Sequence, residues 1–191
     1  MSPLFAAGSL TAFEMDAGDL PSLQRFFEEN PEYHLAVEGE PPGADAAQKE
    51  FDAVPPADWP FEKKWLIGVN DADGRMIGMA DLIENLFVDG VWHIGLFIVA
   101  AHLHGRGTAP GLYRALEAWL REQDCRWIRL GVVEGNARAE RFWEKVGYHE
   151  VRKRRAIPMG RRTNDVRVMV KPLAGGSLRE YLSAVARDRP E

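Results

Sequence analysis

Two neighbouring segments decide the fold of this chain: Val91-Trp92-His93-Ile94-Gly95-Leu96-Phe97-Ile98-Val99 and His104-Gly105-Arg106-Gly107-Thr108-Ala109. The first segment is almost wholly apolar, which is typical of a strand covered on both faces of a sheet. After the second segment, apolar side chains recur with helical spacing, at positions 112, 115, 116, 119 and 120. The sequence therefore predicts a buried central strand, a glycine-rich turn and an amphipathic helix over 109–122.

The flanking segments predict one mixed sheet. Another apolar run, 127–133, follows the helix, and the order strand, helix, strand implies a βαβ crossover between parallel strands. Before the central strand, turn signals separate three shorter runs, which is typical of an antiparallel meander: 10–13, 65–69 and 76–85. After the crossover we expect a helix capped by Asn136 and two antiparallel strands, about 148–156 and 165–171. The expected fold class is α/β, of the mixed-sheet α+β type.

The remaining segments are expected to decorate this sheet. A helix is expected between Asp19 and Asn30, followed by an acidic, proline-rich excursion over 31–62 that contains a short helix at 44–53. In the C-terminal tail, 172–191, Ser177 begins a capping-box pattern that opens a short amphipathic helix. The sequence leaves open whether this helix docks on its own domain or on a second copy of the chain, as in a homodimer.

Length and composition narrow the class of protein. With 191 residues, 46% of them hydrophobic and 28% charged, the chain suits one globular domain and is unlike disordered or collagen-like proteins. Its single cysteine, Cys125, excludes an intrachain disulfide and a cysteine-based zinc cage, and the spacing of its five histidines predicts no metal site. No apolar run is long enough to cross a bilayer, and the N-terminus lacks a secretory pattern. We therefore expect a cytoplasmic protein without membrane contact.

Charge is distributed unevenly along the chain. Residues 1–62 contain 2 Lys/Arg and 13 Asp/Glu, whereas residues 63–191 contain 22 and 16. An acidic N-terminal third argues against general nucleic-acid binding, and the excursion within it predicts attraction of a cationic partner. The basic run Arg152-Lys153-Arg154-Arg155 is open to a nucleic-acid interpretation, but a hairpin edge guarded by charge is the commoner explanation.

The turn at 104–109 has the chemistry of an anion site. Its two glycines let a ligand approach the backbone, and the first N–H groups of the following helix point away from the helix without partners. Together with the helix dipole and Arg106, they would suit a pyrophosphate. The pattern is neither a Walker loop nor a dinucleotide-binding fingerprint. The alternative is that the glycines only permit a tight turn between strand and helix.

Two blocks of sequence resemble the GNAT superfamily of N-acetyltransferases. In that family, a strand and a short loop lead into Gln/Arg-x-x-Gly-x-Gly/Ala at the start of a helix, and here the corresponding block is 97–109. The second family block, Asn-x-x-Ala-x-x-Phe-Tyr-x-x-x-Gly-Phe, is matched by Asn136, Ala139, Phe142, Trp143, Gly147 and Tyr148. Both blocks occur in the family's order and spacing. The resemblance covers a GNAT-like domain over about residues 9–171.

The resemblance implies that the chain binds acetyl-CoA. In the family, the pantetheine arm pairs with the backbone at positions that match Phe97, Ile98 and Val99. The pyrophosphate is held at the positions matching His104, Gly105, Arg106, Gly107, Thr108 and Ala109. Positions matching Asn136 and Trp143 lie beside the pantetheine and the thioester. A backbone N–H near Val99 polarises the thioester carbonyl.

The chain departs from the family pattern at two positions. His104 stands where Gln or Arg is usual, and Trp143 stands where a tyrosine often protonates the departing thiolate. An indole N–H cannot act as a general acid near neutral pH, so water or no acid at all would have to serve.

The residues that would remove the proton from the amine are less defined. His93 occupies a position of the central strand where many relatives carry a carboxylate, and Glu134 follows the next strand. His93 is also explained as a structural histidine, and Glu134 as a residue that biases a helix N-terminus. Asp81 and Glu84 are further acceptors that the sequence does not rank. His102 and His104 are expected on the surface of the loop.

These patterns predict an enzyme that moves acetyl from acetyl-CoA to a primary amine by direct attack. The alternative, suggested by Trp143, is a non-catalytic acyl-CoA-binding module of the same fold. The acceptor is expected to be a cationic small molecule or peptide amine, and the sequence does not identify it.

Overall fold

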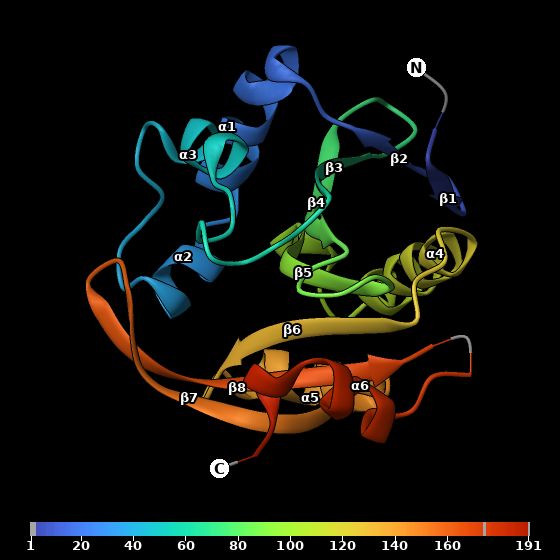
Figure 1. Ribbon diagram of the computed structural model, residues 1–191. Helices are drawn as coiled ribbons and strands as arrows, with labels where there is room; N and C mark the ends of the chain where they lie inside the picture. Colours follow the sequence, from blue (N-terminus) through green and yellow to red (C-terminus); the bar gives the residue numbers. More distant parts are fainter. Residues whose placement is uncertain (1–2, 174, 191) are drawn as a thin grey trace.

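Eight strands form one sheet in the order β1-β2-β3-β4-β5-β6-β8-β7 in the computed structural model, which describes residues 3–173 and 175–190 (Figure 1). The strands are β1 (Phe5–Ala7), β2 (Leu10–Glu14), β3 (Lys63–Asn70), β4 (Met76–Glu84), β5 (Val91–Val99), β6 (Trp127–Val133), β7 (His149–Met159) and β8 (Arg162–Pro172). Neighbouring strands are antiparallel except β5 and β6, which are parallel. The predicted meander, crossover and final antiparallel pair are therefore confirmed.

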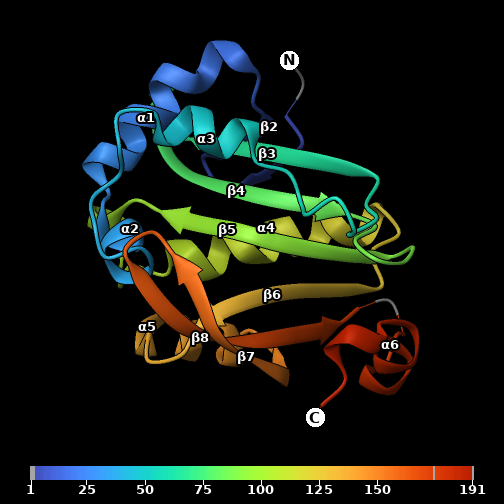
Figure 2. The same cartoon turned by 60° about the vertical axis from the view of Figure 1, so that its left-hand side comes forward.

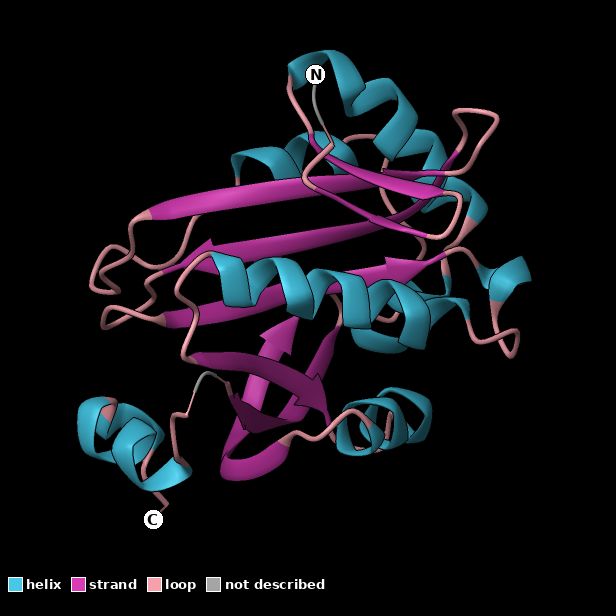
Figure 3. Cartoon of the chain, turned by 90° about the vertical axis from the view of Figure 1, so that its right-hand side faces the viewer, coloured by secondary structure: helices cyan, strands magenta, loops and turns pink. Residues whose placement is uncertain are grey.

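Helices cover both faces of the sheet. On one face lie α1 (Leu20–Glu29), α2 (Glu32–Val37) and α3 (Ala46–Asp52), which are in front of the strands in Figure 2. The opposite face carries α4 (Thr108–Glu122), which lies in front of the strands and roughly along them in Figure 3, and α5 (Ala137–Lys145). Leu112, Leu116 and Leu120 of α4 are fully buried, as the helical spacing of its apolar residues predicts. The crossover thus places the start of α4 at the C-terminal end of β5.

Four features differ from the sequence expectations. β1, a three-residue edge strand, and α2, a six-residue helix without a side-chain cap, carry no pattern long enough to be recognised. The side chain of Asp19 does not cap α1; instead Asp16 caps a 3₁₀ turn, Ala17–Asp19, that runs into it. The final hairpin is longer than expected, because a register shift between Arg154 and Ile157 lets its strands bend and continue.

The bent hairpin crosses to the acidic excursion. The backbone N–H of Arg161 donates to the carbonyl of Glu38 at 2.8 Å, and the side-chain amide of Asn164 donates to the carbonyl of Val37 at 2.8 Å. Arg161 also pairs with Glu40 at 2.7 Å. The basic run Arg152–Arg155 lies on β7 at the edge of the sheet, as the charged-edge interpretation predicts.

The C-terminal helix α6 (Leu178–Ala184) docks on its own domain. Ser177 and Glu180 form the expected capping box, and Tyr181 and Val185 are buried against the apolar face of β6 and β8. The following 3₁₀ turn, Ala186–Asp188, brings a buried carboxylate to the sheet, where Asp188 binds Arg129. Among the described residues, no helix has the length and apolar character needed to span a bilayer.

Candidate active site in the gap between β5 and β6

A bulge at Gly95 opens the centre of the sheet. In the ladder between β4 and β5, Asp81 pairs with Leu96 while Leu82 pairs with Ile94, so Gly95 is the extra residue. Pairing between β5 and β6 runs from Val91 and Trp127 to Ile94 and Leu130 and continues no further. Gly95 and Gly131, the next residue of each strand, are both exposed within the sheet. The two strands therefore diverge where their side chains are smallest.

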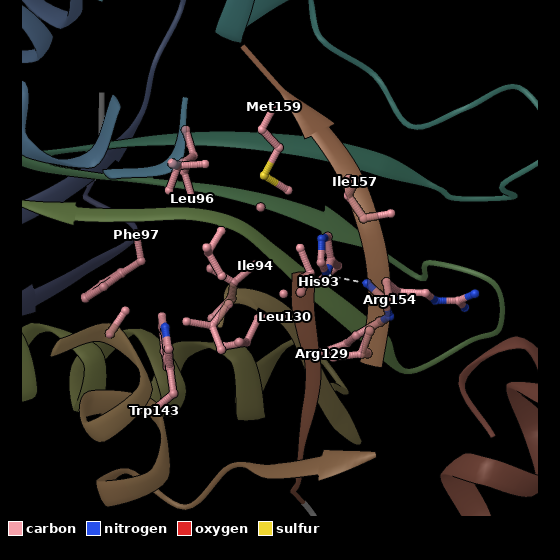
Figure 4. Close-up of a pocket in the computed structure, with 18 of the residues that line it drawn as sticks. His93, Ile94, Leu96, Phe97, Arg129, Leu130, Trp143, Arg154, Ile157 and Met159 are labelled. Atoms are coloured by element: carbon pink, nitrogen blue, oxygen red, sulfur yellow. Dashed lines mark hydrogen bonds between the residues drawn. The ribbon is translucent and has the colours of Figure 1, made fainter. Parts of the chain in front are cut away.

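The divergence creates a cavity of about 510 Å³. Phe97 and Trp143 lie at one end of it, whereas Arg129 and Arg154 lie at the other (Figure 4). Its lining includes Trp143 of α5, on the face that carries α4, and Tyr33 of α2, on the opposite face. The cavity is thus accessible to chemical groups from both faces of the sheet.

The edge of β5 presents main-chain groups to this gap. The N–H of Ala100 donates to the carbonyl of Ile77, which precedes Gly78 on β4. Because successive residues of a strand direct their N–H and C=O groups to opposite sides, those of Phe97 and Val99 point toward the gap. The polar groups of Ile98 point the other way, into the ladder with β4. Phe97 and Val99 are therefore the two positions at which an extended ligand could pair with β5 as an added strand.

His104 fastens the glycine-rich turn to the end of β5. Its Nε2 donates to the carbonyl of Val99 at 2.7 Å, and the residue is half-buried rather than a surface residue as expected. His102 is exposed, in agreement with the expectation. His104, at the position where Gln or Arg is usual in the resembling pattern, thus has a structural role that the sequence did not suggest.

The turn after His104 has the geometry of an anion cradle. Gly105 and Gly107 have φ values of 76° and 80°, and a Cβ at either position would meet nothing within 4 Å. Within the described residues, the N–H groups of Gly105, Gly107, Thr108 and Ala109 donate to no protein acceptor. Open space and unpaired amides at the head of a fifteen-residue helix fit a diphosphate, and the exposed Arg106 adds positive charge.

Asn136 and Trp143 meet the other wall of the gap. The Asn136 side chain caps α5 by accepting from the N–H of Ala139 at 3.3 Å, and the residue also lines the cavity. Trp143 is packed against the rings of Phe97 and Tyr148, with centroids 5.8 and 5.1 Å away. An indole in this position shapes an apolar wall without supplying an acidic proton.

His93 lines the cavity as a neutral imidazole. Its Nδ1 lies 3.2 Å from Nη1 of Arg129, which can only donate, so this nitrogen accepts. Burial, and then the charge of Arg129, lower the pKa of His93 to about 3. A group with that pKa is a weak acceptor for a proton from an ammonium ion.

Glu134 is not among the residues that line the cavity. It is exposed and forms an ion pair with Lys153 of β7. Glu84 accepts from the indole N–H of Trp65 at 2.7 Å. The geometry therefore does not bring Glu134 to the gap with His93.

The carboxyl group beside the bulge is that of Asp81, which is buried, and the half-buried Glu50 interacts with it; neither is among the residues that line the cavity. A Cβ on Gly95 would be 3.0 Å from Oδ2 of Asp81, and Asp81 in turn interacts with Glu50 of α3. Burial, followed by the charge of Asp81, raises the pKa of Glu50 to about 8, and burial raises the pKa of Asp81. Lys64 lies 3.7 Å from Asp81. Asp81 was noted in the sequence without rank; Glu50 lacked any signal, because α3 is far from β4 along the chain.

The protein-family comparison gives one match. A model described as the acetyltransferase (GNAT) family matches residues 23–148, about two thirds of the chain. The chain belongs to the GNAT family of acetyltransferases. This confirms the resemblance inferred from the two sequence blocks, and the chain is therefore an acyltransferase enzyme with a mixed-sheet GNAT fold.

Solved structures similar to this GNAT protein include three N-acetyltransferases. Spermidine N-acetyltransferase from Vibrio cholerae, in complex with CoA and spermine, is 22% identical with a TM-score of 0.65, covering 86% of this chain and 96% of that one. Ribosomal-protein-S18-alanine N-acetyltransferase from Escherichia coli is 17% identical (TM-score 0.64; 88% and 97% covered). A GCN5-related N-acetyltransferase from Kribbella flavida is 22% identical (TM-score 0.63; 88% and 100% covered). The curated proteins contain no match. Likeness at these identities establishes the shared fold.

Replacing Asn136 tests its two roles, as the cap of α5 and as a residue that lines the cavity. We expect Asn136→Ala to cost about 1 kcal/mol of unfolding free energy and to weaken CoA binding as well. Ser177→Ala, which removes the cap of α6 far from the cavity, should cost a similar amount of stability without changing CoA affinity. Urea unfolding and calorimetric titration measure both quantities. Equal CoA affinity in the two variants would confine Asn136 to capping.

The raised pKa of Glu50 predicts a pH-dependent stability. The folded state holds this proton up to about pH 8, whereas the unfolded chain releases it near pH 4.5. The contribution of Glu50 to the free energy of unfolding is therefore fully present below pH 4.5 and is lost as the pH rises through 8. The loss should reach about 2–4 kcal/mol. Urea midpoints between pH 5 and 9 should therefore fall for the native protein and change much less for Glu50→Gln. Parallel curves for the two proteins would contradict the assignment.

Proposed function

We propose that this chain transfers the acetyl group of acetyl-CoA to the nitrogen of a primary amine by direct attack within a ternary complex. The observation that carries the proposal is the opening between β5 and β6, whose cavity is lined from both faces of the sheet, together with the free amides at the head of α4, which follows β5. Acetyl-CoA supplies the acetyl group and a thiolate leaving group. The amide cradle would hold its diphosphate, and the Phe97 and Val99 edge would orient the pantetheine arm.

Proton removal from the amine is assigned to the Asp81 and Glu50 pair. An ammonium nitrogen cannot attack, so the site must hold an acceptor whose pKa lies near the working pH. We favour this pair because Asp81 lies beside Gly95, which lines the cavity, and because burial raises the pKa of its neighbour Glu50 to about 8. The pKa of His93 is lowered to about 3, and Glu134 is exposed and paired with Lys153. We further propose that the Val99 N–H, which faces the gap, stabilises the negative charge that develops on the carbonyl oxygen.

The acceptor carries a positive charge when it arrives. Tyr33 lines the cavity, and the pKa of its hydroxyl is raised by burial and then by Glu50, Glu38 and Asp81. The carboxylates among these groups favour an ammonium ion on this side. The V. cholerae enzyme with a similar fold was solved with the polycation spermine. These observations support the class of amine acceptor, not its identity.

The alternative function is a non-catalytic acyl-CoA-binding module. It is favoured by Trp143, whose indole stands where a proton donor to the thiolate is usual. A thiolate leaves without such help, and water can protonate it afterwards. The absence of an acid at position 143 therefore does not prevent acetyl transfer.

Two measurements test the proposal. Calorimetric titration should show binding of acetyl-CoA with a dissociation constant of about 1–100 μM. Thiol release should then appear on addition of members of an amine panel, and mass spectrometry should find the acetylated amine. Binding without thiol release for every amine would favour the non-catalytic module, and absence of binding would contradict both functions.

A further inference from the structure

Three arginines border the end of the cavity farthest from Trp143. They come from three elements: Arg129 from β6, Arg154 from β7, and Arg187 from the 3₁₀ turn after α6. Figure 4 shows Arg129 and Arg154 at this end, with the Arg129 guanidinium directed at His93. Nothing in the sequence marks these residues as a group, because they lie far apart along the chain.

The carboxylate of Asp188 forms ion pairs with two of these three guanidinium groups. Asp188 is fully buried, and its oxygens lie 2.7 Å from Nε of Arg129 and 3.3 Å from Nη2 of Arg154. Asp188 also accepts from the hydroxyl of Tyr181 at 2.6 Å. These contacts anchor the C-terminal turn, but they balance only one of three positive charges.

Arg187 has no such partner among the residues that the structure describes. Its guanidinium stacks on the rings of Trp59 and Phe87, at 4.0 and 4.7 Å, and its buried Nε lacks a hydrogen-bond acceptor. Burial, and then the charges of Arg154 and Arg129, lower the pKa of Arg187. Stacking on aromatic rings holds the guanidinium fork in place while leaving its N–H groups available. The Arg187 guanidinium is therefore fixed in position, and the carboxylates of Asp188 and Asp58 oppose only part of the positive charge of the three arginines.

We propose that this arginine-lined end binds an oxyanion, a carboxylate or a phosphate, on the same small molecule that presents the amine. The inference rests on the proposed function and adds the acceptor's second functional group. Planar guanidinium groups bind such oxyanions through paired, charge-assisted hydrogen bonds. The acceptor would thus be a zwitterion, positive at its nitrogen and negative at its far end.

The sheet register gives the scale of this acceptor. Asp81 lies beside Gly95, and Arg129 pairs with His93, two residues earlier on β5. Asp81 on β4 and Arg129 on β6 flank β5, so at about 3.3 Å per residue and about 4.8 Å per strand spacing their backbones lie roughly 12 Å apart, and their side chains shorten the gap that remains between the charges. That separation suits one small molecule with its amine and its oxyanion a few bonds apart. A polyamine would place a second positive charge against the arginines.

Matched acceptors test the inference directly. Each ω-amino acid from glycine to the six-carbon member is compared with the alkylamine of equal length, and 2-aminoethyl phosphate is compared with ethanolamine. With saturating acetyl-CoA, kcat/KM is measured from thiol release. In the best-fitting pair, it should be at least about tenfold higher for the amine that carries the oxyanion than for the matched amine without it. The series distinguishes carboxylate from phosphate, and spermidine should be a poor acceptor.

Arg187→Gln is the decisive variant. Its side chain makes no ion pair or hydrogen bond with any described residue, so the variant loses only the stacking on Trp59 and Phe87 and should remain folded with a modest fall in the urea midpoint. The preference for the oxyanion should fall to near unity. Arg155→Gln is the matched control: Arg155 lies on β7 next to Arg154, is exposed, and pairs with Asp165 at 3.4 Å. The control should keep the preference.

A binding measurement separates this inference from the proposed function. The best-fitting amino acid, titrated into the CoA-bound protein, should bind about tenfold more weakly to Arg187→Gln than to the native protein. Such binding without thiol release from any amine would contradict acetyl transfer and support the oxyanion site. Equal kcat/KM for amino acids and alkylamines, with no change in Arg187→Gln, would overturn the oxyanion site while leaving acetyl transfer standing.

Discussion

Gly107→Glu is expected to lower the affinity for acetyl-CoA at least about 100-fold while the protein remains folded. The new carboxylate would project from the residue that precedes α4, into the open space beside the free amides of Thr108 and Ala109. There it would place a negative charge where the diphosphate is proposed to bind, and it would compete for the same N–H groups. Calorimetric titration measures the affinity, and circular dichroism checks the fold.

Gly74→Glu is the matched control for this substitution. Gly74 lies in the turn between β3 and β4 with a φ of 78°, nearly that of Gly107, and a Cβ there also meets nothing within 4 Å. Both substitutions therefore add the same charge and the same backbone strain, about 1–2 kcal/mol. Only the Gly107 variant should lose acetyl-CoA binding. Comparable affinities in the two variants would remove the diphosphate from the head of α4.

The sequence predicted the elements around the glycine-rich turn better than those on the opposite side of the gap. The cradle, the central strand and the Asn136 cap are formed by residues close together in the chain, so local spacing and glycine placement reveal them. Gly95 is different, because a bulge is defined by the register between two strands and no local pattern marks it. Its consequence, the opening between β5 and β6, therefore needed the structure.

The acceptor side is assembled from segments that are distant in sequence. Glu50 and Asp81 meet because α3 packs over β4, and Arg187 reaches the cavity because α6 docks on β6 and β8. Even His93, which the sequence did single out, has its pKa lowered first by burial in the folded protein and then by Arg129 of the neighbouring strand. Residue type and spacing cannot supply such pairings, so the chemistry of this half follows from tertiary contacts alone.

Asp81→Asn is expected to lower kcat about 100-fold, the loss typical of removing a positioned proton acceptor. The amide keeps the size of the side chain beside Gly95 but cannot take the proton of the ammonium ion. Because Asp81 and Glu50 titrate as a pair, the variant should also lose the inflection near pH 8 that the native kcat profile is expected to show. Thiol release at saturating acetyl-CoA and acceptor, between pH 6 and 10, measures both effects.

Glu84→Gln is the control, since it makes the same carboxyl-to-amide change on β4 at a residue that is bonded to Trp65, whereas Asp81 lies beside Gly95. Its kcat and pH profile should match those of the native enzyme. If Asp81→Asn raised KM for the acceptor and left kcat and its pH profile intact, Asp81 would bind the ammonium ion without accepting its proton. The two roles are separable because binding the cation stabilises the ground state, whereas accepting its proton acts only as the nitrogen becomes a nucleophile.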